Sequence, residues 1–151
     1  AYEQKIAEVG GIDYLLLGLG RAGNIGINIA GSSTSSHTRL ILLDQQSRKE
    51  AVNTFSTLDM VPPSAVTMGI ATIMKAKEIA LIAWGEDKAK SVKDVVEGVI
   101  SDSVPASCLQ AHPNANVFID LNAAFELTRI NLRLDKQTNP QGYCMALFQS
   151  K

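Results

Sequence analysis

The chain has 151 residues, of which 46% are hydrophobic and 19% are charged, and this suits one globular domain with a single core. Lys and Arg number 14 against 15 Asp and Glu, so no net field would attract nucleic acid or an anionic membrane surface. No apolar run approaches the roughly 20 residues that cross a bilayer. We therefore expect a cytoplasmic protein whose partner is a small molecule.

The start of the chain reads as the end of a helix, over residues 2–8, without a Met nearby. This indicates a processed product or an expressed fragment. The two cysteines, Cys108 and Cys144, lie far apart and follow neither a redox nor a zinc-ligand spacing. We expect neither a metal nor a cofactor.

Five short apolar runs bounded by turn-forming or polar residues predict strands at 12–19, 39–43, 65–70, 79–84 and 117–120. Each run is too short for a helix, and most lack the alternation of a half-solvated strand. We therefore expect the central strands of a parallel sheet that is covered on both faces.

Helical segments separate these runs, and the clearest is 86–100, where apolar side chains recur at helical spacing at Ala89, Val92, Val96 and Val99. Alternating strands and helices predict a three-layer, doubly wound α/β fold with helices on both faces of a mainly parallel sheet. We expect one domain over 1–151. Its tail, 134–151, is expected to be loosely ordered, with the apolar patch 143–148 docking as a strand or short helix.

The first predicted strand runs into the sequence GLGRAG at 18–23, a literal GxGxxG, and the second ends on Asp44. A dinucleotide-binding fold has this arrangement, with a carboxylate for the ribose. In that fold, however, a helix of several turns follows the third glycine, whereas here Gly26 and Gly31 leave room for about two turns. Dinucleotide binding is therefore a lesser alternative, and a plain tight turn is another.

Glycines after a strand also let backbone N–H groups approach an anion or a sugar, and the N-terminus of a following helix favours negative charge. Ser32 and Ser33 add hydroxyl groups, and Arg39 opens the next strand with a guanidinium group suited to phosphate. A phosphorylated metabolite fits this pattern. A solvated loop followed by a strand-end cation is the alternative.

Residues 18–33 resemble the loop GxGxDGHIxFNEPxSS of the glucosamine-6-phosphate deaminase (isomerase) family. Further stretches resemble the family in the same order, at 38–39, 61–62, 65–69, Gly85, Lys88, 96–98, 107–113 (SCLQAHP, against SxLQxHP), Asp120 and 126–128. The resemblance extends to about residue 133. It favours the deaminases over the related 6-phosphogluconolactonases, which have a different sequence after the glycine loop and lack the LQxHP stretch.

The resemblance implies the C-terminal half of a doubly wound α/β fold. The absent N-terminal half would supply a GGSTP-like phosphate loop and the Asp base that moves a proton between C1 and C2. The implied partner is a hexosamine phosphate or a related sugar phosphate. The chain is expected to be a homo-oligomer or the remainder of a longer chain.

Family members open and isomerise an amino sugar phosphate and then release ammonia, using an Asp, a His and a Glu of the loop. Those three positions hold Ala22, Asn24 and Ile29 here. Ala and Ile cannot transfer protons, and Asn does not titrate near neutrality. We therefore expect impaired catalysis, with a non-catalytic sugar-phosphate-binding, structural or regulatory module as the alternative.

Substrate or phosphate contacts are expected from Gly20, Gly23, Asn24, Asn28 and Lys88. Lys88 lies where members place a phosphate-binding lysine, and Asn24 could keep a neutral hydrogen bond to the sugar. A phosphate-contacting Arg of the family aligns with Asn53 here. Arg48 could take over its role only if the helix is rotated.

An allosteric phosphate site of some family members corresponds to Ser32 and Arg39, although its lysine is Ile41 here. Regulation is therefore doubtful on sequence alone. His112, beside a proline, is expected to be structural. Core positions are expected for Cys108 and for three aromatic residues, Trp84, Phe118 and Phe125.

Overall fold

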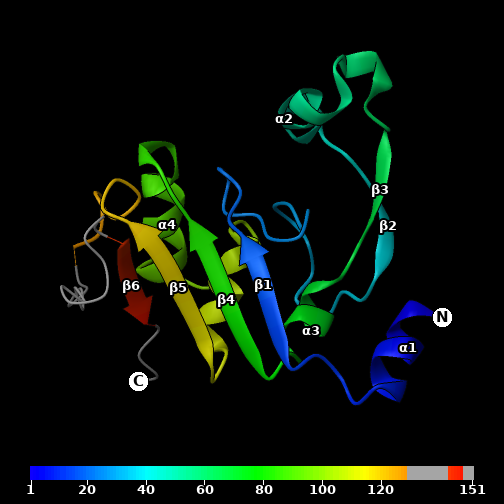
Figure 1. The fold of residues 1–151 in the computed structure, drawn as a ribbon, viewed down its shortest axis with the longest axis horizontal. Coiled ribbons are helices and arrows are strands. Elements are labelled where there is room, and N and C mark those ends of the chain that lie inside the picture. The colour runs from blue at the N-terminus through cyan, green and yellow to red at the C-terminus, as the bar shows by residue number, and fades with distance from the viewer. Residues whose placement is uncertain (129–142, 148–151) are drawn as a thin grey trace.

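Four strands form the main sheet in a computed structural model that describes residues 1–128 and 143–147 (Figure 1). Their order is β1 (Tyr14–Gly18), β4 (Glu78–Ala83), β5 (Ala115–Asp120) and β6 (Tyr143–Leu147). β1, β4 and β5 run parallel, and β6 is antiparallel to β5. The prediction of a mainly parallel sheet is confirmed.

The strands β2 (Arg39–Leu42) and β3 (Ser64–Thr67) correct one prediction, because they form a separate antiparallel pair. Leu40 and Leu42 of β2 are exposed to 68% and 76%, so this pair is not covered on both faces. With α2 (Gln45–Phe55) and the short helix η1 (Leu58–Met60), it forms an arm beside the main sheet (Figure 1). The apolar runs at 39–43 and 65–70 predicted strands correctly, but they did not predict which strands would pair.

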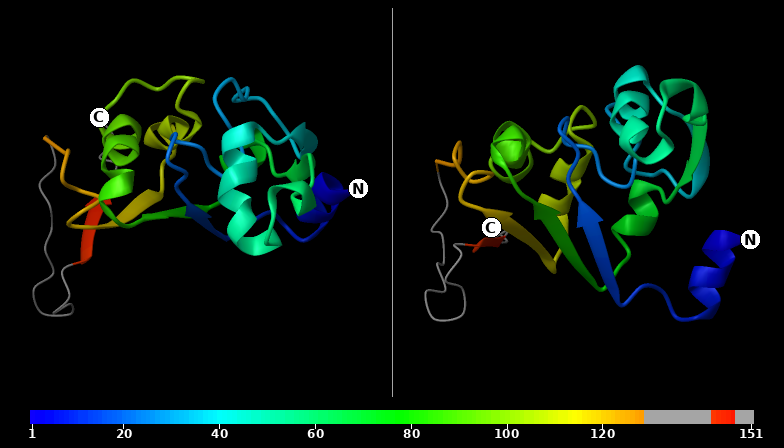
Figure 2. Two further views of the ribbon diagram at one scale, coloured as in Figure 1. Left: turned by 90° about the horizontal axis from the view of Figure 1, so that it is seen from above. Right: turned by 45° about the horizontal axis from the view of Figure 1, so that its top comes forward.

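One face of the main sheet carries the core. The helix α4 (Ala89–Val96) and the 3-10 helix η3 (Pro105–Ala111) lie together on this face (Figure 2). The predicted helix 86–100 begins as the 3-10 turn η2 (Glu86–Lys88) and ends with α4. Fully buried side chains from both layers form the core, among them Ile79, Leu81, Val92, Val95, Leu109, Val117 and Ile119.

The opposite face of the sheet is open in the part of the chain that the structure describes. No described helix lies on it, and Tyr14 and Leu16 of β1 are 55% and 60% exposed (Figure 1). The expected helices on both faces are therefore present on one face of this half-length fold. A run of apolar residues in a predicted strand indicates that the strand is buried, but it does not identify the segment that covers it.

The expected positions of the aromatic side chains are partly wrong. Trp84 and Phe125 are 51% and 78% exposed, because both follow the carboxyl end of a strand and leave the core there. Phe118 is half-buried on the open face. The prediction relied on apolar neighbours in the sequence. Those neighbours belong to the strands, and they carry no information on where the chain leaves the core after a strand ends.

The end of the chain is described only at β6, which confirms that the apolar patch docks as a strand. The remainder of the predicted tail, 134–142 and 148–151, lies outside the described residues. Among the described helices, none has the length and apolar character needed to span a membrane.

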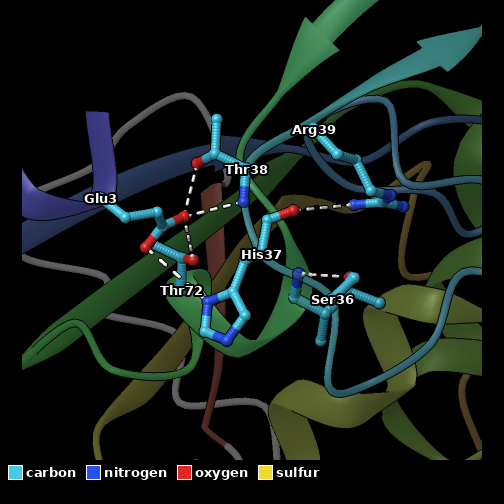
Figure 3. A network of polar contacts seen from close by, with 7 residues as sticks. Glu3, Ser36, His37, Thr38, Arg39 and Thr72 are labelled. Atoms are coloured by element: carbon cyan, nitrogen blue, oxygen red, sulfur yellow. Dashed lines mark hydrogen bonds and ion pairs between the residues drawn. The ribbon is translucent and has the colours of Figure 1, made fainter. Parts of the chain in front are cut away.

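The N-terminal helix α1 (Tyr2–Glu8) is held by polar contacts, since none of its side chains is buried. The Glu3 carboxylate accepts hydrogen bonds from Thr38 N (2.7 Å), Thr38 Oγ1 (2.5 Å) and Thr72 Oγ1 (2.6 Å), and lies 3.8 Å from His37 Nδ1 (Figure 3). These contacts join α1 to the segment before β2 and to α3 (Ile70–Ile73). A seven-residue helix is marginal alone, so Glu3 fixes its position.

Replacing Glu3 with Gln is expected to remove an acid-sensitive part of the stability. Hydrogen bonds from Thr38 and Thr72 lower the pKa of Glu3 from 4.5 to about 2. A lowered pKa stabilises the fold above pH 4.5, and this contribution is lost as the pH falls toward 2. Because the side chain is 36% exposed, the effect at neutral pH should be no more than about 1 kcal/mol.

Thermal unfolding of the wild type and Glu3→Gln between pH 7 and pH 2 tests this, with Glu8→Gln of the same helix as the control. The difference between wild type and Glu3→Gln should shrink as the medium becomes acidic. A difference that stays constant over the whole pH range would show that the ionised carboxylate is not responsible.

Candidate functional site

The carboxyl ends of the three parallel strands meet at one edge of the sheet, which is where ligands bind in open α/β folds. β1 leads into the glycine loop there, and β4 leads into Gly85. At the end of β5, Asp120 accepts hydrogen bonds from Gly85 N (3.1 Å) and Ala123 N (2.8 Å). Asp120 thus fixes the turn that begins η2, next to the glycine loop.

The glycine loop is shaped by its own contacts. Gly20 N donates to Asn24 O (2.9 Å), and Gly23 N donates to Gly20 O (3.0 Å). A Cβ on Gly20 would lie 1.8 Å from Asn24 Oδ1, and one on Gly23, whose φ is +73°, would lie 2.6 Å from Val104 Cγ1. The left-handed backbone favours glycine at Gly23, whereas a side chain at position 20 would displace the side chain of Asn24. The N–H groups of both glycines donate within the loop, and their contact with a ligand stays a prediction.

No α-helix follows the loop, since residues 21–38 form turns and isolated bridges. The expected two-turn helix, with its favourable N-terminus, is therefore absent from this part of the chain. Gly26 and Gly31, at φ of +51° and +84°, account for this, because left-handed backbone interrupts a helix. Without that helix the loop lacks the pyrophosphate site of a dinucleotide-binding fold.

A cavity of about 340 Å³ lies between the glycine loop and the start of α2. The loop lines it with Arg21, Ala22, Asn24, Ile29 and Ala30, and the segment of α2 lines it with Asp44, Gln46, Ser47 and Glu50. The structure thus brings together all three positions at which the resemblance places acid–base residues. The other expected contact residues, Gly20, Gly23, Asn28 and Lys88, do not line this cavity.

Two carboxylates line the cavity, from Asp44 at the N-cap of α2 and from Glu50 within the helix. Asp44 caps the helix by accepting a hydrogen bond from Ser47 N (2.7 Å), and this bond lowers the pKa of Asp44. Glu50 accepts a hydrogen bond from Gln46 Nε2 (3.0 Å). The sequence prediction considered Asp44 only as a ribose contact and missed Glu50. Asp44, Ser47 and Glu50 are spaced three residues apart at the N-cap and in the first turns of α2. This spacing, which places them on one side of the helix, was the signal in the sequence.

Lys88 lies in η2, which adjoins the glycine loop. The two segments are joined by an ion pair between Arg21 Nε and Asp87 Oδ2 at 2.9 Å. Lys88 is half-buried, and no ion pair joins its ammonium group to a described residue. Its position as a phosphate contact beside the cavity stays a prediction.

Asn28 has a structural position. It is fully buried, and its Nδ2 donates to Ile25 O (3.0 Å) and Met68 O (2.9 Å), while Oδ1 accepts from Arg39 Nη1 (2.9 Å). These bonds join the loop to the end of β3 and the start of β2. Both donors of the amide are thus used within the chain, which gives Asn28 a structural role, and its substrate contact stays a prediction.

Ser32 and Arg39, the pair expected at an allosteric phosphate site, are in contact. Arg39 Nη2 donates to Ser32 Oγ at 3.2 Å, while Nη1 is bonded to Asn28 and lies 3.4 Å from His37 O. The structure therefore supplies the proximity that such a site needs, although the guanidinium group already has partners. A regulatory role stays a prediction.

The arginine positions of α2 do not form a phosphate clamp. Asn53 is exposed and does not line the cavity. Arg48 Nη2 donates to Leu58 O (3.0 Å) and Val61 O (3.3 Å), so it holds the segment after α2. Arg48 does not line the cavity either.

His112 and Cys108 have the structural positions that the sequence predicts. His112 is buried, accepts a hydrogen bond from Asn114 N at Nδ1 (3.1 Å), and donates from Nε2 to Ala76 O (2.9 Å). Only the neutral ring protonated on Nε2 makes both bonds. Cys108 is buried, and burial raises the pKa of its thiol to about 11.

Comparison with known proteins agrees with these features. The family model of glucosamine-6-phosphate isomerases/6-phosphogluconolactonase matches residues 1–118. A glucosamine-6-phosphate deaminase-like protein of Bacteroides thetaiotaomicron is 57% identical over 129 residues, which are 85% of this chain and 20% of that protein. The glucosamine-6-phosphate deaminase of Hahella chejuensis is 49% identical over 131 residues, or 87% of this chain and 50% of that enzyme.

Among solved structures, a monomeric glucosamine-6-phosphate deaminase superposes with a TM-score of 0.81 at 42% identity, over 83% of this chain and 52% of that one. The 6-phosphogluconolactonase of Trypanosoma brucei, at 22% identity and a TM-score of 0.63, shares the fold. The chain spans about half the length of these enzymes, and a smaller share of the Bacteroides protein. By sequence and by fold, it belongs to the glucosamine-6-phosphate isomerase/6-phosphogluconolactonase family.

Proposed function

We propose that the chain binds a hexosamine phosphate in the cavity at its glycine loop, and that it has little deaminase activity by itself. The observation that carries this proposal is the cavity lining, where Ala22, Asn24 and Ile29 lie together. These are the positions of the acid–base residues in the family loop that residues 18–33 resemble. The cavity volume of about 340 Å³ lies within the usual range for small-molecule sites.

The cavity lining suits an amino sugar. Asp44 and Glu50 offer carboxylates to an ammonium group, and neither forms an ion pair with a described residue. The amides of Asn24 and Gln46 offer donors and acceptors to sugar hydroxyl groups. Lys88, in the turn that Arg21 joins to the loop, is the cation that we assign to the phosphate.

Weak catalysis follows from the same lining. A general acid or base contributes about 10²–10⁴-fold in rate, and Ala22, Asn24 and Ile29 supply none. Asp44 is a poor substitute as a base, because the hydrogen bond from Ser47 N lowers its pKa and favours the ionised form. A weakly basic carboxylate takes up a proton less readily at neutral pH.

Calorimetric titration and thermal unfolding with glucosamine 6-phosphate test the binding, and ammonia release tests the turnover. We expect glucosamine 6-phosphate to raise the melting temperature, glucose 6-phosphate to raise it less because it lacks the amine, and NAD to leave it unchanged. A shift with NAD alone would contradict the proposal. No shift with any sugar phosphate would favour a structural or regulatory module.

Lys88→Ala is expected to weaken binding of glucosamine 6-phosphate about tenfold or more, because a charge-assisted hydrogen bond to phosphate is lost. Binding of glucosamine without the phosphate should change little. Lys90→Ala is the matched control, since Lys90 lies two residues further on and forms an exposed pair with Asp94. Equal effects of the two substitutions would remove Lys88 from the site.

A further inference from the structure

Arg21 is the only cation among the described residues that line the cavity. The family loop GxGxDGHIxFNEPxSS leaves this position variable, so the resemblance assigns no role to Arg21. A guanidinium group has five N–H donors in a planar fork, and this fork matches the oxygens of a phosphate or carboxylate. Arg21 is therefore a candidate for a ligand contact that is particular to this chain.

An ion pair orients the guanidinium group of Arg21. Its Nε lies 2.9 Å from Asp87 Oδ2, and neither Nη1 nor Nη2 has a hydrogen bond or an ion pair with a described residue. Nε carries one of the five donors, and the two Nη atoms carry the other four. The side chains of the pair are 60% and 47% exposed, so the pair itself contributes little to stability. Asp87 thus holds the group by one nitrogen and leaves the other two available to a ligand.

The same ion pair places Arg21 next to the turn that carries Lys88. Asp87 and Lys88 are consecutive residues of η2, and Asp120 fixes the start of this turn through Gly85 N. The ammonium group of Lys88 forms no ion pair with a described residue. Two cations with unused donors therefore adjoin one end of the cavity.

A phosphate at this end of the cavity needs more than one cation. A phosphate monoester carries about 1.5 to 2 negative charges at neutral pH, and Lys88 supplies one positive charge. The arginine that the family would provide from α2 is Asn53 here, and neither Asn53 nor Arg48 lines the cavity. Arg21 is the cation of the lining that can supply the second charge.

We propose that Arg21 and Lys88 bind the phosphate together, so that an arginine of the glycine loop replaces the arginine missing at position 53. The Nη atoms of Arg21 donate to two phosphate oxygens, while Asp87 keeps its bond to Nε and acts as a positioning residue. This inference rests on the proposed function, because it names the groups that recognise the phosphate of the same ligand. It makes phosphate recognition depend on a residue that the family motif does not specify.

Calorimetric titration of Arg21→Gln with glucosamine 6-phosphate and with glucosamine tests the inference. The ratio of the two affinities isolates the contribution of the phosphate. Arg21→Gln should reduce this ratio by about three- to tenfold, since a charge-assisted contact is lost at a partly exposed side chain. The matched control is Lys49→Gln, an exposed residue of α2 outside the cavity lining, and it should leave the ratio unchanged. Both variants should unfold near the wild-type temperature.

The double variant Arg21→Gln/Lys88→Ala should bind the two ligands with nearly equal affinity, and Arg21→Lys should lie between the wild type and Arg21→Gln. An unchanged ratio in Arg21→Gln would overturn the inference while the wild type still binds glucosamine 6-phosphate. An equal loss of affinity for both ligands would place Arg21 at the sugar and overturn it as well. A wild type that binds neither ligand would overturn the proposed function and this inference with it.

Discussion

Replacing Asn28 with alanine is expected to lower the free energy of unfolding by about 2–4 kcal/mol. The substitution leaves the carbonyl groups of Ile25 and Met68 without this donor, and it removes an acceptor from the guanidinium group of Arg39. Each lost hydrogen bond contributes about 0.5–1.5 kcal/mol, and about 1.5–3 kcal/mol where one partner is charged, as Arg39 is. The cost is large because Asn28 joins the glycine loop to both strands of the arm.

Urea unfolding of Asn28→Ala and of the exposed control Asn53→Ala measures this effect. Asn53→Ala should stay within about 0.5 kcal/mol of the wild type. The comparison also separates two roles for Asn28. A small loss of stability combined with a large loss of sugar-phosphate affinity would place the amide at the ligand, as the sequence alone suggested, and not in the support of the loop.

The strands illustrate what the sequence could predict of the fold. Short apolar runs located all five predicted strands to within a few residues, because β-branched and aliphatic residues favour a pleated, partly buried surface. Pairing was not predictable in the same way. β2 and β3 read as central parallel strands, yet they pair with each other, since Leu40, Leu42 and Val66 point to solvent on a small two-stranded sheet.

The candidate site was also predictable only in part from the sequence. The order of the motifs placed Ala22, Asn24 and Ile29 at one site, and the structure gathers them on one cavity. The structural role of Asn28 was hidden, because it depends on Met68, forty residues away. Hydrogen bonds between residues so far apart in the sequence depend on tertiary packing, and the spacing of residues in the sequence does not predict them.

Restoring the family residues at the loop is expected to restore turnover when the half of the family fold that this chain does not match is also present. The test is a chimera that joins the unmatched half of the monomeric deaminase to this whole chain. In this chimera the triple substitution Ala22→Asp, Asn24→His and Ile29→Glu should raise kcat/KM for ammonia release by about 10²–10⁴-fold over the unsubstituted chimera. Single substitutions should give much less, because acid–base residues act as a unit. The same triple substitution in the chain alone should give no turnover, since the resemblance assigns the proton-transferring Asp to the other half.

Steady-state ammonia release gives the rates, and calorimetry gives the affinity of each variant for glucosamine 6-phosphate. Adding Lys88→Ala to the triple variant should raise KM more than it lowers kcat, because a phosphate contact acts in the ground state and the transition state alike. A triple variant that binds ligand but is no faster than the unsubstituted chimera would show that these positions do not limit the chemistry. An unsubstituted chimera as active as the parent deaminase would show that Asp44 and Glu50, the cavity's own carboxylates, already suffice.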